Sequence, residues 1–294
     1  MDVIEVNDLR RAYGRTRALD GVDLAVQAGT TVAVLGPNGA GKSTLIEILE
    51  GHRSRDGGTV RVLGRDPERG TRAWRDRLGI VLQESRLVSE LTARELLDLY
   101  AGYYAAPRPV PEVLAETGLV GRADRRPEQM SGGERRRLEL ALAIVGRPEL
   151  LFLDEPTASF DPEARRRTWE LVAGLQDAGI TVVLTTHDLE EAAALADRIV
   201  VLAEGRVVAD ASPPALRAAA GPPVVRFRVP VGVAPPPLRV ALDRHADGTL
   251  SAAVPQPTDL LRTLCTWEEE SGHRLSELSV TCPTLEDAYF ELIR

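Results

Sequence analysis

The feature that most constrains this chain is the glycine-rich run GPNGAGKST at residues 36–44. It fits the pattern G-x-x-x-x-G-K-[ST], in which backbone N–H groups cradle phosphates. A short β-rich apolar run, TTVAVL at 30–35, precedes it, and TLIEIL at 44–49 follows with apolar residues at helical spacing. We therefore expect a buried parallel strand, a tight turn, and a helix whose positive N-terminus faces the turn. This arrangement predicts an α/β domain with a phosphate site.

Lys42 is the only lysine in the sequence, since all other members of the 36 lysine and arginine residues are arginine. A composition that keeps lysine only here indicates that arginine cannot serve at this position. A compact ammonium can reach between β- and γ-phosphates, where a planar guanidinium would crowd the loop. Ser43 would offer its hydroxyl to Mg²⁺. The predicted phosphate-binding residues are Gly36, Pro37, Asn38, Gly39, Ala40, Gly41, Lys42, Ser43 and Thr44.

Two carboxylates end a second apolar run, LLFLDE at 150–155. Asp154 and Glu155 would lie at the C-terminal edge of a strand, where ligands of open α/β sheets bind. Asp154 can join the ligand shell of Mg²⁺, and Glu155 can position or deprotonate an attacking water. An ordinary strand end with a turn at Pro156 would explain the same letters, but the lysine loop favours the catalytic interpretation.

Three further signals are weaker when each is taken alone. Ser131, Gly132 and Gly133 precede a helical run with a basic first turn, so they form a second helix N-terminus that could hold phosphate. On spacing alone, a serine cap and a solvated basic face are the favoured interpretation. His187 follows the strand-like TVVLTT, within plausible reach of a γ-phosphate, although a lone histidine is usually structural. Tyr13 could stack on adenine by its ring face.

Composition narrows the range of partners. Acidic residues outnumber basic ones by 44 to 36, giving a net charge of −8, which argues against broad binding to nucleic acid. No stretch approaches the ~18 apolar residues needed to span a bilayer, and the first residues lack the pattern of a signal peptide. Any work across a membrane is therefore expected to need a partner. Cys265 and Cys282 have no metal-ligand spacing and are expected to be reduced cytosolic thiols.

The 294 residues have room for one large domain and one small domain. A change in composition at SPPALRAAAGPP (212–223) marks the expected boundary, so we predict domains over 1–218 and 219–294. The first would contain a mostly helical insert over about 85–130, interrupted by prolines, and short N-terminal strands that suggest an antiparallel β layer. The second is expected to be a small α+β domain.

Taken in order, these motifs resemble the nucleotide-binding subunit of ABC transporters. The resemblance covers about residues 1–218 and depends on the ordered set, which is far more specific than any one motif. It identifies 36–44 as the Walker A loop and Asp154 as the end of Walker B. It likewise identifies Glu155 as the catalytic glutamate, His187 as the switch histidine and Tyr13 as the adenine-stacking aromatic.

The resemblance adds assignments that the residues alone do not supply. Gln83 matches the Q-loop glutamine, which touches metal and water, and Asp161 matches the D-loop aspartate. MSGGE at 130–134 matches the signature usually written LSGGQ. Two departures stand out: Glu134 replaces the usual glutamine, and Phe160 makes the D-loop bulkier. The implied fold is a P-loop NTPase ABC cassette with a mostly parallel core sheet flanked by helices, an antiparallel β subdomain and a helical subdomain.

The resemblance implies an ATPase that uses ATP and Mg²⁺. Each ATP would lie between the Walker A loop of one copy and the Ser131 segment of a second copy, in a head-to-tail dimer that drives an integral membrane permease. The tail SVTCPTLEDAYFELIR at 279–294 resembles drug and antibiotic exporters of the ABC-2, daunorubicin-resistance-like group. Export of a drug, antibiotic or lipid-like compound is therefore expected, with the chain at the inner face of the cell membrane.

Two alternatives stay open. One is an importer ATPase, because the membrane partner largely sets the direction of transport. The other is a soluble ABC ATPase acting on DNA or the ribosome, which the single cassette and the lack of a long coiled-coil insert disfavour. The C-terminal domain would serve dimer contact or regulation, or would simply add stability.

Overall fold

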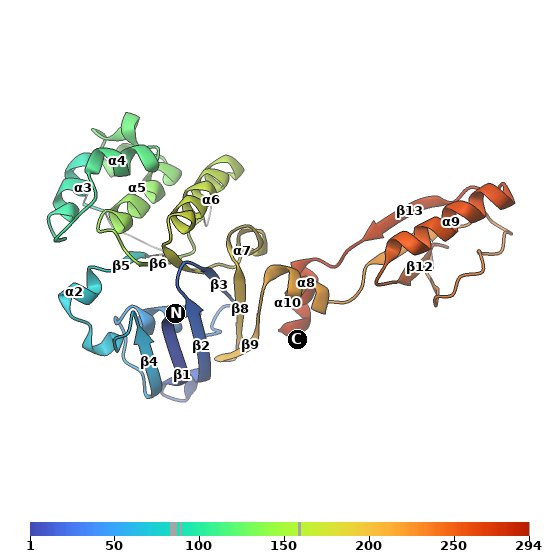
Figure 1. Cartoon of the computed structure of the whole chain (residues 1–294), viewed down its shortest axis with the longest axis horizontal. Coiled ribbons are helices and arrows are strands. Elements are labelled where there is room, and N and C mark those ends of the chain that lie inside the picture. The colour runs from blue at the N-terminus through green and yellow to red at the C-terminus, as the bar shows by residue number, and fades with distance from the viewer. Residues whose placement is uncertain (83–86, 89, 158–159, 294) are drawn as a thin grey trace. The chain divides into compact units, whose positions relative to one another are not determined.

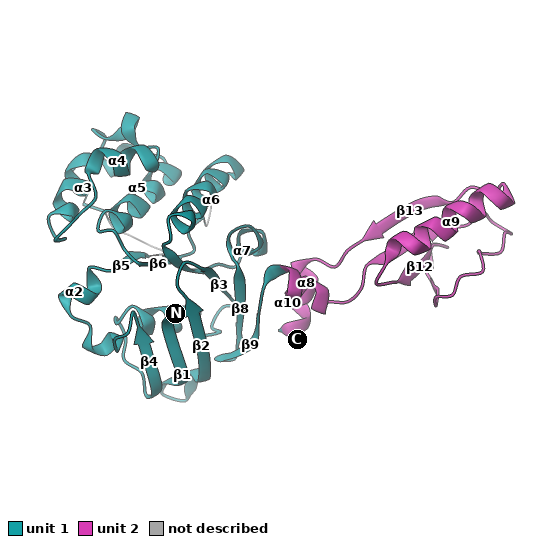
Figure 2. Cartoon of the chain, viewed as in Figure 1, with its two compact units in different colours: residues 1–213, 293 teal, residues 214–292, 294 magenta. Residues whose placement is uncertain are grey.

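The computed structural model describes residues 1–82, 87–88, 90–157 and 160–293. The chain divides into two compact units, Met1–Pro213 with Ile293, and Pro214–Leu292 (Figure 2). Each unit has a hydrophobic cluster of its own. Among the described residues, no helix combines the length and apolar content that crossing a bilayer requires.

A six-stranded sheet forms the centre of the first unit (Figure 1). In spatial order its strands are β5 (Leu78–Val81), β6 (Leu150–Asp154), β7 (Thr181–Thr185), β3 (Thr31–Leu35), β8 (Arg198–Ala203) and β9 (Arg206–Ala211). The first five run parallel, and β9 pairs antiparallel with β8. The central strands are buried almost throughout, which explains why their sequences are continuous apolar runs.

Helices connect these strands, as parallel pairing requires. They are α1 (Lys42–Leu49) after β3, α5 (Gly132–Ile144) before β6, α6 (Pro162–Asp177) between β6 and β7, and α7 (Leu189–Leu195) between β7 and β8. The connections place the residues that follow β3, β6 and β7 at one edge of the sheet. That edge is where the motifs of the sequence converge.

An antiparallel sheet lies beside this core, with the order β2 (Thr16–Gln27), β1 (Asp2–Tyr13) and β4 (Gly57–Val62). Its apolar residues, among them Ile4 and Leu24, belong to the same buried cluster as Val34 and Phe152 of the central sheet. The two sheets therefore share one hydrophobic core. This core fixes the end of β1, which carries Tyr13, relative to the loop after β3.

A helical region separates β5 from β6. It contains α3 (Ala93–Ala101), α4 (Val110–Glu116) and the short turns η2 (Val120–Arg122) and η3 (Pro127–Gln129), while η1 (Pro67–Arg69) and α2 (Arg72–Arg75) precede β5. Thr92 and Glu95 form a capping box at the start of α3. The helices α3 and α4 pack on α5, and Arg122 of η2 pairs with Glu134 in the first turn of α5.

The second unit contains a four-stranded antiparallel sheet, ordered β11 (Asp243–Arg244), β12 (Leu250–Ala253), β10 (Val224–Arg228) and β13 (Ser276–Thr281). The helix α9 (Pro257–Ser271) contributes Leu260 and Leu264 to a core with Val225 and Phe227. Two more helices, α8 (Pro213–Ala219) and α10 (Leu285–Leu292), complete the element order.

Candidate functional site

A cavity of about 350 Å³ opens beside the residues that follow β3 and β6. Nine of the residues that line it carry motif assignments from the sequence; the exception is Ala18 in β2. The lining residues are Tyr13, Ala18, Asn38, Gly39, Gly41, Lys42, Ser43, Thr44, Asp154 and Glu155. The structure therefore brings residues from distant parts of the chain to one cavity.

The loop from 36 to 44 needs glycine at both of its ends. Gly36 has a φ of 154°, and a Cβ there would lie 2.2 Å from the carbonyl oxygen of Leu202. Gly41 has a φ of 105°, and a Cβ there would lie 2.3 Å from the carbonyl oxygen of Ala18. Any side chain at either position would collide with backbone, so the loop follows its path only with glycine.

The N-terminus of α1 lies at this cavity, and no side chain caps its backbone N–H groups. Gly41 caps the helix with no side-chain hydrogen bond, and the first turn contains no acidic residue. The Lys42 ammonium donates to the carbonyl oxygens of Gly36 at 2.7 Å and Pro37 at 3.1 Å. Burial lowers the pKa of Lys42, and the carboxylates of Glu155 and Asp154 oppose that shift. Backbone N–H groups and one half-buried cation make this a site for an anion.

The carboxylates of Asp154 and Glu155, at the end of β6, contact Thr185 at the end of β7 and His187 in the loop that follows. The Thr185 hydroxyl donates to Oδ1 of Asp154. The Glu155 backbone N–H donates to the Thr185 carbonyl at 3.0 Å, and Glu155 has a φ of 47°. Oε1 of Glu155 lies 3.2 Å from Nδ1 of His187. This pair of a carboxylate and an imidazole can accept and hold a proton.

Tyr13 lies at the rim of the cavity, where 39% of the residue is exposed. The guanidinium carbons of Arg11 and Arg53 lie 5.0 Å and 5.3 Å from the centre of its ring. Cations at these distances are attracted to the ring and hold it in place. The sequence pointed to Tyr13 but not to the two arginines.

The segment from Ser131 to Gly133 begins α5 and lies outside the residues that line the cavity. The Ser131 hydroxyl accepts from the Glu134 N–H at 3.2 Å, and the Glu134 carboxylate accepts from the Ser131 N–H at 2.9 Å. The same carboxylate accepts from Nε of Arg122 at 2.6 Å. The Ser131 backbone bond, with help from Arg122, lowers the pKa of Glu134. The predicted serine cap is therefore present, and Glu134 is paired within its own chain.

The prediction of a solvated basic face after this cap is wrong for Arg136. Arg135 is exposed, but Arg136 is buried and donates to the backbone carbonyls of Asp154 and Pro156, which flank Glu155. The sequence pattern placed Arg136 among polar residues, and nothing in its spacing indicated that several backbone carbonyls would lie beside it.

The two remaining predicted residues lie elsewhere or outside the described part of the chain. The Asp161 carboxylate accepts from the N–H groups of Glu163 and Ala164 at 3.0 and 2.9 Å, so it caps α6. Gln83 falls outside the described residues.

Ser43 and Asp154, the described residues predicted to bind metal, both line the cavity. They offer a hydroxyl and a carboxylate, which are the hard oxygen ligands that Mg²⁺ prefers. Within the described ranges, no group of three or more histidine, cysteine or acidic residues could hold a metal ion alone. The donor set fits an ion that takes its other ligands from water and a bound phosphate.

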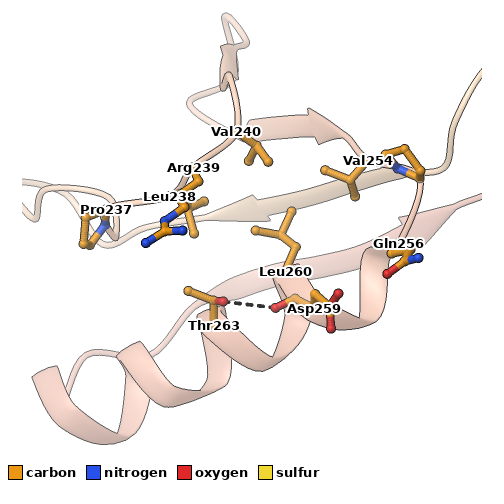
Figure 3. Close-up of a pocket in the computed structure, with 10 residues that line it drawn as sticks. Pro237, Leu238, Arg239, Val240, Val254, Gln256, Asp259, Leu260 and Thr263 are labelled. Atoms are coloured by element: carbon orange, nitrogen blue, oxygen red, sulfur yellow. Dashed lines mark hydrogen bonds between the residues drawn. The ribbon is translucent and has the colours of Figure 1, made fainter.

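A second cavity, of about 570 Å³, lies in the C-terminal unit between α9 and the segment at 237–240 (Figure 3). Leu238, Val240, Val254 and Leu260 form its apolar part. The polar residues along it, Arg239, Gln256, Asp259 and Thr263, are all exposed. It contains no motif residue, so the chemistry predicted from the sequence belongs to the cavity in the first unit.

Known proteins have sequences similar to this chain. The family described as ABC transporter matches residues 19–158. The daunorubicin/doxorubicin resistance ATP-binding protein DrrA of Streptomyces peucetius is 41% identical over 275 residues, which covers 89% of this chain and 83% of that relative. The Nod factor export ATP-binding protein I of Paraburkholderia xenovorans (strain LB400) is 39% identical over 218 residues, 72% of each chain.

Solved structures agree with the sequence relatives. An ATP-binding subunit of an ABC transporter superposes with a TM-score of 0.67 at 30% identity, covering 74% of this chain and 92% of that one. A bacterial ABC transporter cassette solved as a dimer gives a TM-score of 0.63 at 28% identity, covering 71% and 98%. The predicted α/β P-loop cassette fold is thereby confirmed. Sequence, fold and relatives agree that this chain belongs to the ABC transporter family as one of its ATP-binding, ATP-hydrolysing subunits.

Proposed function

We propose that this subunit hydrolyses Mg-ATP to power the export of a drug, antibiotic or lipid-like compound through a separate membrane permease. The observation that carries the catalytic part is the 3.2 Å contact between Glu155 and His187 beside the cavity that contains Lys42. The export part draws on the relatives named for daunorubicin resistance and Nod factor export.

The predicted site residues have distinct roles in this proposal. Glu155 positions and deprotonates the attacking water, and His187 holds the carboxylate in place and contacts the γ-phosphate. Lys42 and the loop N–H groups bind the β- and γ-phosphates, as in other phosphate-binding loops. Tyr13 stacks on the adenine, and Asp161 stands near the second copy's nucleotide. Gln83 is proposed to touch the metal and the water.

Ser43 and Asp154 would hold Mg²⁺, together with phosphate oxygens and water. The ion supplies neutralisation of the charge that develops on the phosphates. The hydrogen bond from Thr185 fixes one oxygen of Asp154, which leaves the other oxygen to face the ion.

A second copy of the chain is proposed to complete the site in a head-to-tail dimer. Gly132 is exposed, has an ordinary helical backbone, and a Cβ there would meet nothing within 4 Å. The chain itself therefore gives no reason for glycine at the start of α5, where glycine weakens a helix. Close approach of a phosphate bound to the other copy supplies the reason.

The permease would hold the subunit at the inner face of the cell membrane. For the C-terminal unit we propose a role in contact between copies or in regulation. The two functional domains are proposed to be residues 1–218 and 219–294.

The test of catalysis is Glu155→Gln in the purified full-length chain. We expect Mg-ATP binding close to that of the parent and turnover reduced at least about 100-fold, because an amide cannot accept the proton. Glu170→Gln on the exposed surface of α6 is the matched control and should hydrolyse ATP like the parent. Unchanged turnover in the Glu155 variant would remove the assignment of the general base.

The test of the transport role is capture of membrane proteins from cells of the source organism. Tagged chain carrying Glu155→Gln, trapped with Mg-ATP, should recover an integral membrane protein. Recovery of ribosomes or DNA without a membrane protein would favour the soluble alternative. ATP-dependent efflux from cells that express the subunit with that membrane protein would then establish the direction.

A further inference from the structure

Arg136 donates hydrogen bonds to backbone carbonyls at the ends of two strands, β5 and β6. It lies in α5 and is 7% exposed. Its guanidinium donates through Nη1 to the carbonyl of Leu82, through Nη2 to those of Asp154 at 2.5 Å and Glu155 at 3.3 Å, and through Nε to that of Pro156 at 3.3 Å. Nη1 also donates to Oε2 of Glu139 at 2.7 Å. All three nitrogens of the guanidinium are thus hydrogen-bonded inside the protein.

The carbonyls that receive hydrogen bonds from Arg136 lie at the C-terminal ends of β5 and β6. The pairing of β5 with β6 ends at Val81 and Leu153. Within the described ranges, no further pairing between these two strands follows, so the carbonyls at this point need other donors. A planar group with five N–H donors can reach several such carbonyls at once, which a lysine ammonium cannot do as well.

The turn that Arg136 holds has an unusual backbone. Glu155 has a φ of 47°, a left-handed conformation that non-glycine residues adopt only when their surroundings enforce it. Arg136 donates to the carbonyl of Glu155 and to those on either side of it. From the opposite side, the Glu155 N–H donates to the Thr185 carbonyl. These bonds fix the turn that directs the Glu155 carboxylate toward His187.

We propose that Arg136 is a positioning residue for ATP hydrolysis, acting through the backbone turn of Glu155. The inference rests on the proposed role of Glu155 as the base. Arg136 also ties this turn to α5, which begins with the segment Ser131–Gly133. A displacement of that segment when it engages nucleotide on a second copy would therefore be transmitted to the catalytic turn of its own chain.

The first experiment separates turnover from binding in the full-length chain. Arg136→Met keeps the length of the side chain and removes every donor. We expect kcat at saturating Mg-ATP to fall about 10- to 100-fold, since small misplacements of a catalytic group have effects of that size. The dissociation constant of a fluorescent ATP analogue should stay within about threefold, because Arg136 does not line the cavity.

Two further variants calibrate that result. Arg136→Lys keeps the charge but loses the fork of donors, so its kcat should lie between those of the parent and Arg136→Met. Arg166→Met removes an arginine from the exposed face of α6, where it pairs with Glu170, and should leave kcat within about twofold. A parent-like kcat in Arg136→Met would overturn the proposal.

A double-variant cycle shows whether Arg136 acts through Glu155 or by general support of the fold. In a Glu155→Gln background, adding Arg136→Met should change the residual single-turnover rate by less than about threefold, because the group it positions is already gone. A further tenfold loss would mean that Arg136 acts elsewhere. If Arg136→Met does not fold, Arg136→Lys takes its place in the same cycle. A parent chain that binds but never hydrolyses Mg-ATP would contradict the proposed function itself, not the link through Arg136.

Discussion

At the scale of single residues, Glu134 is the departure that the structure explains best. A carboxylate at the start of α5 would repel a triphosphate, but Arg122 pairs with it at 2.6 Å. Removing Arg122 should leave the negative charge uncompensated beside the proposed phosphate site. In an Arg122→Ala chain that also carries Glu155→Gln, the ATP concentration needed for dimer formation should rise about 3- to 10-fold, roughly 1 kcal/mol.

The compensating variant makes this prediction specific. Adding Glu134→Gln to Arg122→Ala should restore the ATP dependence of dimer formation, measured by light scattering, because the repelling charge is gone. Glutamine can still accept from the Ser131 N–H, so the cap of α5 is kept. If the added glutamine brings no recovery, Arg122 acts by some route other than neutralising Glu134.

The titration of Glu50 should make the free energy of unfolding depend on pH. Burial raises the pKa of its carboxyl to about 8, with Asp154 and Glu47 adding to the shift. Between pH ~4.5 and ~8, the unfolded chain releases this proton while the folded chain keeps it, so stability falls as pH rises through that window. Glu50→Gln should therefore be more stable than the parent by roughly 4–5 kcal/mol at pH 8.5, since each pKa unit corresponds to about 1.4 kcal/mol, and about equal near pH 4.5.

Urea unfolding followed by tryptophan fluorescence at several pH values measures the difference. Glu112→Gln on the exposed side of α4 serves as the control, and its difference from the parent should be small at every pH. A stability gap for Glu50→Gln that narrows as pH rises would show that Glu50 is ionised in the folded chain.

At the scale of elements, the turn between β3 and α1 contains two glycines, Gly39 and Gly41, that should differ in how well they tolerate a side chain. A Cβ at Gly41 would meet the Ala18 carbonyl at 2.3 Å, whereas a Cβ at Gly39, with φ 81°, would meet nothing within 4 Å. Without nucleotide, Gly39→Ala should cost about 1–2 kcal/mol from backbone strain alone. Gly41→Ala should cost at least about 3 kcal/mol, because β2 must also move. Equal losses of unfolding free energy in the two variants would contradict this contrast.

Local pattern predicted those elements whose determinants are close in sequence. The strand, loop and helix at 30–49 follow from glycines and apolar spacing. The Glu204-Gly205 pair also predicts a turn, and the structure joins β8 and β9 there, with positive φ at both positions. The N-terminal strands, which the sequence suggests are short, are both long: β1 covers Asp2–Tyr13 and β2 covers Thr16–Gln27, and their pairing has several register shifts.

The sequence pattern gave the wrong environment for side chains whose hydrogen-bond partners are distant in sequence. The spacing of Asp188 and Glu191 predicts a capping box; Asp188 does cap α7, but the Glu191 side chain does not bond to the Asp188 backbone N–H. Glu191 is buried and accepts from the Thr157 hydroxyl at 2.6 Å and Trp169 Nε1 at 3.1 Å. Arg136 is the same case, since its carbonyl partners come from segments that only the sheet brings together. Neither set of partners lies within one helical turn, so spacing could not reveal them.

At the scale of the whole molecule, the division into two compact units predicts that the nucleotide site does not depend on the C-terminal core. The lining of the nucleotide cavity comes entirely from the first unit, and the core around Leu264 entirely from the second. Leu264 is fully buried on α9. Leu264→Ala should destabilise the second unit by about 2–4 kcal/mol through loss of packing and the cavity that remains.

If the units fold independently, this damage should not reach the ATP site. The Mg-ATP affinity of Leu264→Ala, measured by calorimetry, should stay within about twofold of the parent, while urea unfolding shows one transition moved to lower denaturant and the other unchanged. Leu278→Ala, on the exposed strand β13, is the control and should move neither transition by more than about 0.5–1 kcal/mol. Loss of ATP binding in Leu264→Ala alone would mean that the C-terminal core supports the cassette, because the control removes the same side chain without opening a buried cavity.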